Sequence, residues 1–227
     1  MKRCYNCGIA FTELTKDKRT KEHIPAQTFF SGYPIEYKNQ RKTVPACYDC
    51  NQEYSKIDDY LRDIIGFVNE SDPQKVEMTR QAVKKIFTNK KELLQKISFD
   101  DNNIIFTADA NILDKLHKKN FKGIYTQLTK NPLAKEYLLD VYSDGHAEEK
   151  LNLGFEFLSE IESWTNWDVS GNENIFRYKM AYFDFSKNSL EKFEILNPEP
   201  DFLICAMEYN KTIVSLVVAI KPTMNLK

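Results

Sequence analysis

The stretches Cys4-Tyr-Asn-Cys7-Gly and Cys47-Tyr-Asp-Cys50-Asn decide the fold of the N-terminal part of this chain, and 39 residues separate the two pairs. A Cys-x-x-Cys turn places two thiolates on one side of a tight knuckle, and two knuckles complete a tetrahedral site with Zn–S distances of about 2.3 Å. A redox Cys-x-x-Cys pair is the alternative, but the second pair and the absence of a preceding βαβ pattern favour metal. We therefore expect a structural Zn²⁺ on Cys4, Cys7, Cys47 and Cys50, with no coordination position open to substrate.

The charge balance of the whole chain differs from that of its N-terminal part. The 227 residues include 32 Lys and Arg against 33 Asp and Glu, a formal net charge of −1, and 42% of them are hydrophobic. This composition provides a core and excludes a polybasic, histone-like protein. Residues 1–46, however, hold nine basic and four acidic side chains, and nine minus four gives +5. A local basic zone is what binding to the phosphate backbone of a nucleic acid requires.

Hydropathy and the first residues of the chain indicate in which cell compartment the protein is expected. No apolar stretch approaches the roughly 20 residues that a spanning helix needs. The segment Met1-Lys2-Arg3 runs directly into the first knuckle, without the apolar stretch of a signal peptide. We expect a cytoplasmic protein with no membrane partner, in which thiols stay reduced and favour metal over disulfides. The fifth cysteine, Cys205, lies in an apolar run and is expected to be a small buried core residue.

Periodic patterns predict an α+β fold in two parts, divided near residue 70. Residues 1–70 hold the zinc knuckles and the start of a helix whose apolar spacing extends from Gln52 to Asn69. Residues 71–227 predict helices over about 73–142, including 110–128 and 132–142, with a short strand at 104–106. Strand signals follow over about 175–220, among them 193–195 and a hairpin formed by 202–207 and 212–220. An antiparallel, β-rich C-terminal region is therefore expected.

The segment between the knuckles contains Glu22-His23-Ile24-Pro25, and the second knuckle runs directly into Asn51. Together these elements resemble HNH endonucleases of the ββα-metal type, in which two Cys-x-x-Cys knuckles often bracket an acidic-His-x-Pro strand. The resemblance covers about residues 1–62, little more than a quarter of the chain. It implies that residues 1–70 form a zinc-stapled ββα-metal module.

The same resemblance implies a metal-dependent endonuclease that hydrolyses phosphodiester bonds in DNA. His23 would be the general base, because a neutral imidazole can accept a proton near pH 7. Glu22 and Asn51 would hold a divalent Mg²⁺ or Mn²⁺, which prefers oxygen ligands. The chain departs from the family between Arg41 and Ala46, where many members carry a middle Asn.

The positions of other charged residues indicate which of them contact DNA, bind metal or are structural. Four cations are expected to contact DNA phosphates: Lys21, Arg41, Lys42 and Lys56. Asp58 and Asp59 are reserve metal ligands, although we favour their interpretation as solvated helix charges. His117 and His146 lie outside the motif and are expected to be structural.

Several functional alternatives stay open at this point. A nicking enzyme, a restriction enzyme and a phage-defence effector all suit the motif, and the chain can form a homodimer. A second hypothesis is a catalytically inactive, zinc-stabilised module that binds nucleic acid or a protein. In a third, the C-terminal region is a ligand sensor and the zinc module is an adaptor.

Overall fold

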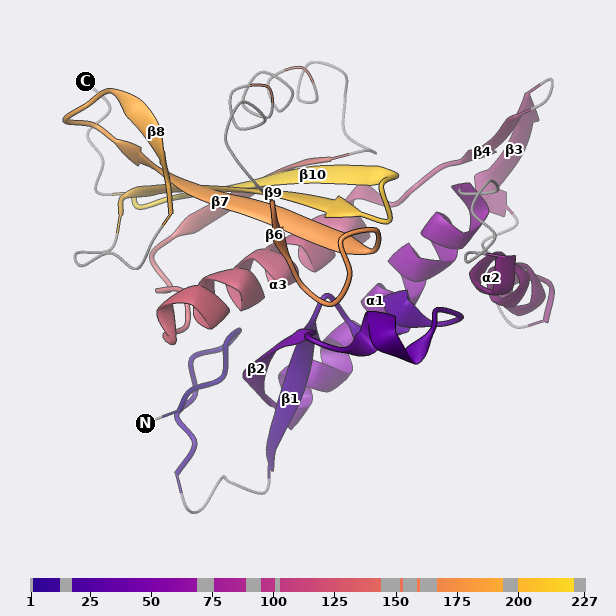
Figure 1. Cartoon of the computed structure of the whole chain (residues 1–227), viewed down its shortest axis with the longest axis horizontal. Helices are drawn as coiled ribbons and strands as arrows, with labels where there is room; N and C mark the ends of the chain where they lie inside the picture. Colours follow the sequence, from indigo (N-terminus) through magenta and orange to yellow (C-terminus); the bar gives the residue numbers. More distant parts are fainter. Residues whose placement is uncertain are drawn as a thin grey trace.

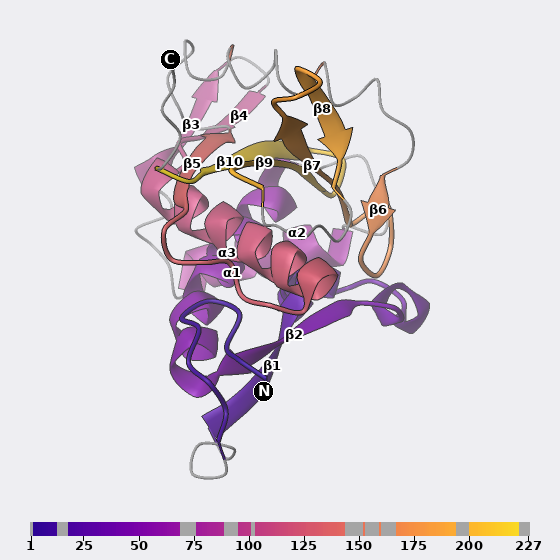
Figure 2. The same ribbon diagram turned by 90° about the vertical axis from the view of Figure 1, so that its left-hand side faces the viewer.

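A mixed α+β architecture organises the chain in layers (Figures 1 and 2). The computed structural model describes residues 2–12, 18–68, 76–88, 95–100, 103–143, 167–193 and 200–222, together with 152 and 159. A six-stranded antiparallel sheet forms one layer, and helix α3 (Ala110–Thr129) covers one of its faces. The N-terminal elements lie against the other side of α3, and Phe29 and Lys42 also reach the sheet, where they contact Tyr209 and Tyr178.

The N-terminal elements follow the order strand, strand, helix. Strands β1 (Arg19–Ile24) and β2 (Lys42–Cys47) pair antiparallel, with Glu22 opposite Val44 and His23 opposite Thr43. Two short 3-10 turns lie in the connection between these strands, η2 (Gln27–Phe30) and η3 (Ile35–Lys38). Helix α1 (Tyr48–Val68) begins directly after β2. The second Cys-x-x-Cys pair therefore spans the junction of strand and helix.

The middle of the chain adds two helices and a hairpin. Helix α2 (Val76–Thr88) packs on α1, and β3 (Ile97–Asp100) pairs with β4 (Asn103–Phe106). The predicted strand at 104–106 is confirmed. Helix α3 begins after Asp109, whose carboxylate accepts hydrogen bonds from the backbone N–H groups of Asn111 and Ile112.

The sheet is assembled mainly from the C-terminal third of the chain. Its strand order is β5 (Leu138–Ser143), β10 (Ile213–Ile220), β9 (Phe202–Tyr209), β7 (Phe176–Asp184) and β6 (Asp168–Val169), and β8 (Ser189–Lys192) also pairs with β7. The β9–β10 hairpin confirms the prediction for 202–220. Asn210 and Lys211 take positive φ of 51° and 56° in its turn, and a short polar residue such as Asn tolerates that conformation.

One predicted helix is wrong. Residues 138–143 form strand β5 instead of the end of a helix over 132–142, and they pair with β10. Leu139 is half-buried and Val141 is buried, which is the period of two that a strand requires. Pairing with β10 therefore overrides the helical pattern predicted for residues 138–142. Of the predicted strand at 193–195, Phe193 follows β8, and the other two residues lie outside the described residues, as does His146.

A shared core joins the N-terminal elements to the sheet. One buried cluster includes Phe29 and Leu61 together with Phe121 of α3 and Phe176 and Tyr209 of the sheet. The division near residue 70 stays a prediction, and this cluster extends across it. None of the helices in the described ranges combines the length and apolar character that crossing a membrane demands.

Candidate metal centre and adjoining polar site

The four cysteines of the two knuckles converge as predicted. The Sγ atoms of Cys4, Cys7, Cys47 and Cys50 all lie within 4.8 Å of one another. The 3.8 Å between the sulfurs of Cys7 and Cys47 is about the edge of a tetrahedron with Zn–S bonds of ~2.3 Å. The cluster can therefore hold a zinc ion. Such an ion would connect the first knuckle to the end of β2 and the first turn of α1.

Backbone and side-chain contacts shape the first knuckle. Gly8 has a φ of 75°, and its N–H donates to the carbonyl oxygen of Cys4 over 3.0 Å. The side-chain amide of Asn6 lies 3.5 Å from the sulfur of Cys50, and its oxygen accepts from Lys122 Nζ over 3.0 Å. Helix α3 is thus hydrogen bonded to the knuckle through Lys122.

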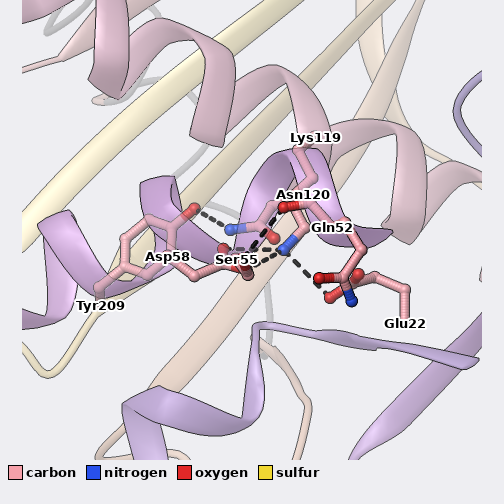
Figure 3. A network of polar contacts seen from close by, with 7 residues as sticks. All are labelled: Glu22, Gln52, Ser55, Asp58, Lys119, Asn120 and Tyr209. Carbon is pink, nitrogen blue, oxygen red and sulfur yellow. Dashed lines mark hydrogen bonds and ion pairs between the residues drawn. The ribbon is translucent and has the colours of Figure 1, made fainter. Parts of the chain in front are cut away.

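Glu22, Asp58 and Lys119 form a buried polar triad (Figure 3). Lys119 Nζ lies 2.6 and 2.7 Å from the two carboxylate oxygens of Asp58. The same ammonium lies 3.1 Å from Oε1 of Glu22. The exposed fractions of Lys119, Glu22 and Asp58 are 0%, 4% and 4%. Strand β1, helix α1 and helix α3 each contribute one member, so the triad connects three elements.

Aromatic rings surround the triad and reduce its access to water. The ammonium of Lys119 lies 5.6 Å from the centre of the Tyr54 ring, and Tyr5 is fully buried nearby. Burial raises the pKa of Asp58 to about 6, while the charge of Lys119 acts in the opposite direction and that of Glu22 adds to the increase. The prediction that Asp58 is a solvated helix charge is therefore wrong. Asp59 is half-buried and forms an ion pair with Arg62 at 2.8 Å.

His23 and Asn51 occupy less buried positions than Glu22. The side chain of His23 is half-buried on β1, and its pKa is lowered, first by burial and then by the positive charges of Arg41, Lys119 and Lys21. The imidazole is therefore neutral at neutral pH and able to accept a proton. Asn51 is half-buried in the first turn of α1, directly after Cys50 of the four-cysteine cluster.

The four predicted phosphate contacts differ in exposure. Lys21 and Lys56 are exposed, whereas Arg41 and Lys42 are half-buried. The guanidinium of Arg41 lies 5.5 Å from the centre of the Phe30 ring, and its Nε donates to a backbone carbonyl. The ammonium of Lys42 donates to the hydroxyl of Tyr178 in the sheet. Lys42 is therefore directed toward the core. Of the four predicted cations, Arg41 and Lys21 are the ones whose charges act on His23.

Lys119 was missed in the sequence. It follows two other basic residues of the stretch 115–119, which is typical of a solvated helix face, and only the packing of α3 against α1 reveals its burial. The interpretations of His117 and Cys205 are confirmed. His117 is fully buried with Nδ1 3.3 Å from the hydroxyl of Tyr209, and Cys205 is fully buried in β9.

Glu22, one of the two residues expected to bind a catalytic divalent metal, does not fit that role in this arrangement. Oε1 of Glu22 already contacts the ammonium of Lys119. Oε2 of Glu22 is buried and has no hydrogen-bond partner in the described part of the chain, so one oxygen of the carboxylate stays open. A divalent ion at Glu22 would thus lie close to a fully buried positive charge, which opposes its binding.

The whole chain was compared with protein-family models, with curated proteins and with solved structures, and none of them matches it. The resemblance to HNH endonucleases therefore rests on the motifs of residues 1–62 alone.

Proposed function

We propose that the protein is a nuclease that hydrolyses phosphodiester bonds in DNA, with His23 as the general base. The observation that carries this proposal is the half-buried His23 on β1, whose pKa is lowered by burial and by neighbouring cations. The succession of β1, β2 and α1 around a four-cysteine cluster supports it as well.

The chemistry asked of the site is acid–base catalysis next to fixed positive charge. The neutral imidazole of His23 takes a proton from water as the water oxygen attacks the phosphorus. The bond between the phosphorus and the leaving sugar oxygen breaks, and that oxygen gains a proton from solvent. Arg41 and Lys21 supply positive charge near His23, which stabilises the added negative charge on the phosphate oxygens. The chain itself supplies all of these groups. Glu22 has no part in the reaction and keeps its ion pair with Lys119.

A second candidate is a zinc-stabilised module that binds nucleic acid without cleaving it. The observation that favours it is the ammonium of Lys119, which is bound to the carboxylate that HNH enzymes use for metal. In this case the basic N-terminal residues still bind the phosphate backbone, and His23 is dispensable.

Cleavage assays separate the two candidates. Zinc-loaded protein is incubated with supercoiled plasmid, with Mg²⁺, with Mn²⁺ or without either ion, beside a His23→Ala variant. We expect the wild type to cleave and His23→Ala to lose at least about 100-fold in rate, the usual contribution of a general base. Zinc content and melting temperature of the variant show whether it is folded.

Binding measurements complete the design. Removal of the exposed charge in Lys21→Ala should lower the salt dependence of DNA affinity by about one counterion. Lys211→Ala is the matched control, because Lys211 is an exposed lysine in the β9–β10 turn. Binding without cleavage under every condition would favour the second candidate. The absence of both would exclude DNA as the substrate.

A further inference from the structure

The ammonium of Lys119 occupies the position between two carboxylates that a divalent cation would take. It contacts both oxygens of Asp58 at 2.6 and 2.7 Å and Oε1 of Glu22 at 3.1 Å, and it is fully buried. We infer that Lys119 is the resident cation of this site and excludes divalent metal from Glu22 and Asp58. The inference goes beyond the proposed function, because it concerns cation binding and holds whether or not the protein cleaves DNA.

Charge is the first argument. Two carboxylates and one ammonium leave the buried triad at −1, whereas an added divalent ion would bring the same group of charges to +1. Removing the ammonium would leave −2 at two carboxylates that are each only 4% exposed, which is unfavourable without another cation. The buried carboxylates therefore need a cation, and the chain itself supplies one in Lys119.

Geometry is the second argument. The ammonium is attached to α3, and Asn120, the next residue of that helix, donates to the hydroxyl of Tyr209 over 2.9 Å. Figure 3 shows Lys119 and Asn120 extending from α3 toward opposite partners, Asp58 and Glu22 for one and Tyr209 for the other. The sheet thus fixes the part of the helix that presents the ammonium. Displacement of Lys119 by metal would require this packing to change.

The open oxygen of Glu22 indicates what the site would do without Lys119. Oε2 of Glu22 is buried and has no hydrogen-bond partner within the described ranges, so it remains available as a ligand. With a neutral residue at position 119, carboxylate oxygens of Glu22 and Asp58 become ligands of the kind that Mn²⁺ accepts. The inference therefore predicts that a metal site is gained when the lysine is lost.

Mn²⁺ binding to the full-length, zinc-loaded protein tests this inference. Electron paramagnetic resonance measures the binding at about pH 8, where carboxylates are ionised. The wild type, Glu22→Gln and the surface control Glu36→Gln should bind Mn²⁺ equally weakly. Lys119→Met should gain one Mn²⁺ site at least tenfold tighter than any in the wild type. In the double variant that combines Lys119→Met with Glu22→Gln, that site should be lost.

Two results would overturn the inference. One is a wild-type Mn²⁺ site that Glu22→Gln weakens tenfold and Glu36→Gln does not, since metal would then displace Lys119. The other is a folded Lys119→Met protein without a gained site. Should Lys119→Met fail to fold, the comparison of wild type, Glu22→Gln and Glu36→Gln decides by itself. Cleavage plays no part in any of these readouts, so failure of the nuclease proposal stays distinguishable.

Discussion

At the scale of single residues, partial burial and positive neighbours act on His23 in the same direction. Both disfavour the imidazolium, so its pKa lies below the ordinary value of 6.5. A base with a lowered pKa is deprotonated over a wider range of acidic pH. This residue is therefore suited to accept protons in slightly acid solution.

The pH dependence of cleavage follows from this direction. The acid limb of the rate profile should lie below pH 6.5 for the wild type, because His23 is neutral above its lowered pKa. Arg41→Ala removes one of the charges that lower this pKa, so its acid limb should move toward 6.5. Rate profiles of both proteins between about pH 4.5 and about pH 8 check the shift. An acid limb that moves to lower pH in Arg41→Ala would contradict the assignment of His23.

Unlike that of His23, the pKa of Asp58 is raised, and this makes the stability of the folded protein depend on pH. Burial raises its pKa from 3.8 to about 6, so the folded state binds more protons than the unfolded state between these values. The stabilisation from this group is therefore full below about pH 4 and is lost as the pH rises through about 6. Relative to Asp58→Asn, the free energy of unfolding of the wild type should decrease over this interval. Urea denaturation of both proteins in excess zinc measures the difference, and an increase with pH would contradict the prediction.

At the scale of elements, α3 approaches β1 closely at a glycine. A Cβ placed on Gly123 would lie 2.3 Å from Cδ1 and 2.6 Å from Cγ1 of Ile24. Glycine normally weakens a helix by about 1 kcal/mol relative to alanine. At this position the missing side chain allows the helix to pack against the strand that carries Glu22 and His23.

Gly123→Ala should therefore destabilise the protein by about 1–3 kcal/mol, the usual range for overpacking, in place of the gain expected from helix propensity. In an Ile24→Ala background the clashing atoms are absent, and the same substitution should be neutral or stabilising. A double-mutant cycle by chemical denaturation measures the coupling. Equal effects of Gly123→Ala in both backgrounds would show that Ile24 is not the cause.

The four-cysteine cluster joins the first knuckle to the junction of β2 and α1. Cys7→Ser should lose the bound zinc and destabilise the knuckle, because binding of structural zinc contributes directly to folding. Cys205→Ser is the matched control, since Cys205 lies in β9 outside the cluster and its replacement should leave one zinc per chain. Zinc content and melting temperature, measured with and without chelator, check both variants. Full retention of zinc in Cys7→Ser would exclude Cys7 as a ligand.

At the scale of the whole molecule, the N-terminal elements share their core with the sheet. Phe29 of η2 lies 5.8 Å, centre to centre, from the ring of Tyr209, 180 residues further along the chain. The hydroxyl of Ser170 donates to the carbonyl oxygen of Ile24 and accepts from the N–H of Lys42 over 2.9 Å. The ends of β1 and β2 are thus held by a residue that follows β6.

Residues 1–70 alone should therefore not fold, even with zinc, because Phe29 and its neighbours would lose the apolar surface that buries them. Heteronuclear NMR of the zinc-loaded fragment, compared with the full chain, measures the dispersion of its amide signals. A well-dispersed spectrum of the fragment would instead favour an independent N-terminal domain.

The sequence predicts local features better than contacts between distant segments. The four-cysteine cluster and the β9–β10 hairpin follow from short-range spacing, so they were predictable from Cys-x-x-Cys pairs and a turn. Strand β5 was missed because its partner β10 lies about 70 residues away in the chain. The burial of Lys119 was missed for the same reason, since its carboxylate partners belong to β1 and α1. Long-range packing gives no periodic signal in a single sequence.

The triad of Glu22, Asp58 and Lys119 also constrains how these three positions can vary among related sequences. Asp58 and Lys119 are 61 residues apart in the chain, yet loss of the lysine charge leaves two buried carboxylates without their cation. Natural selection would thus act on the three positions jointly, and related sequences should exchange them together or not at all. A relative with a neutral residue at the position of Lys119 should carry compensating changes at the two acidic positions or a metal between them. Co-variation at these three sites is therefore a signature by which relatives of this protein can be sorted.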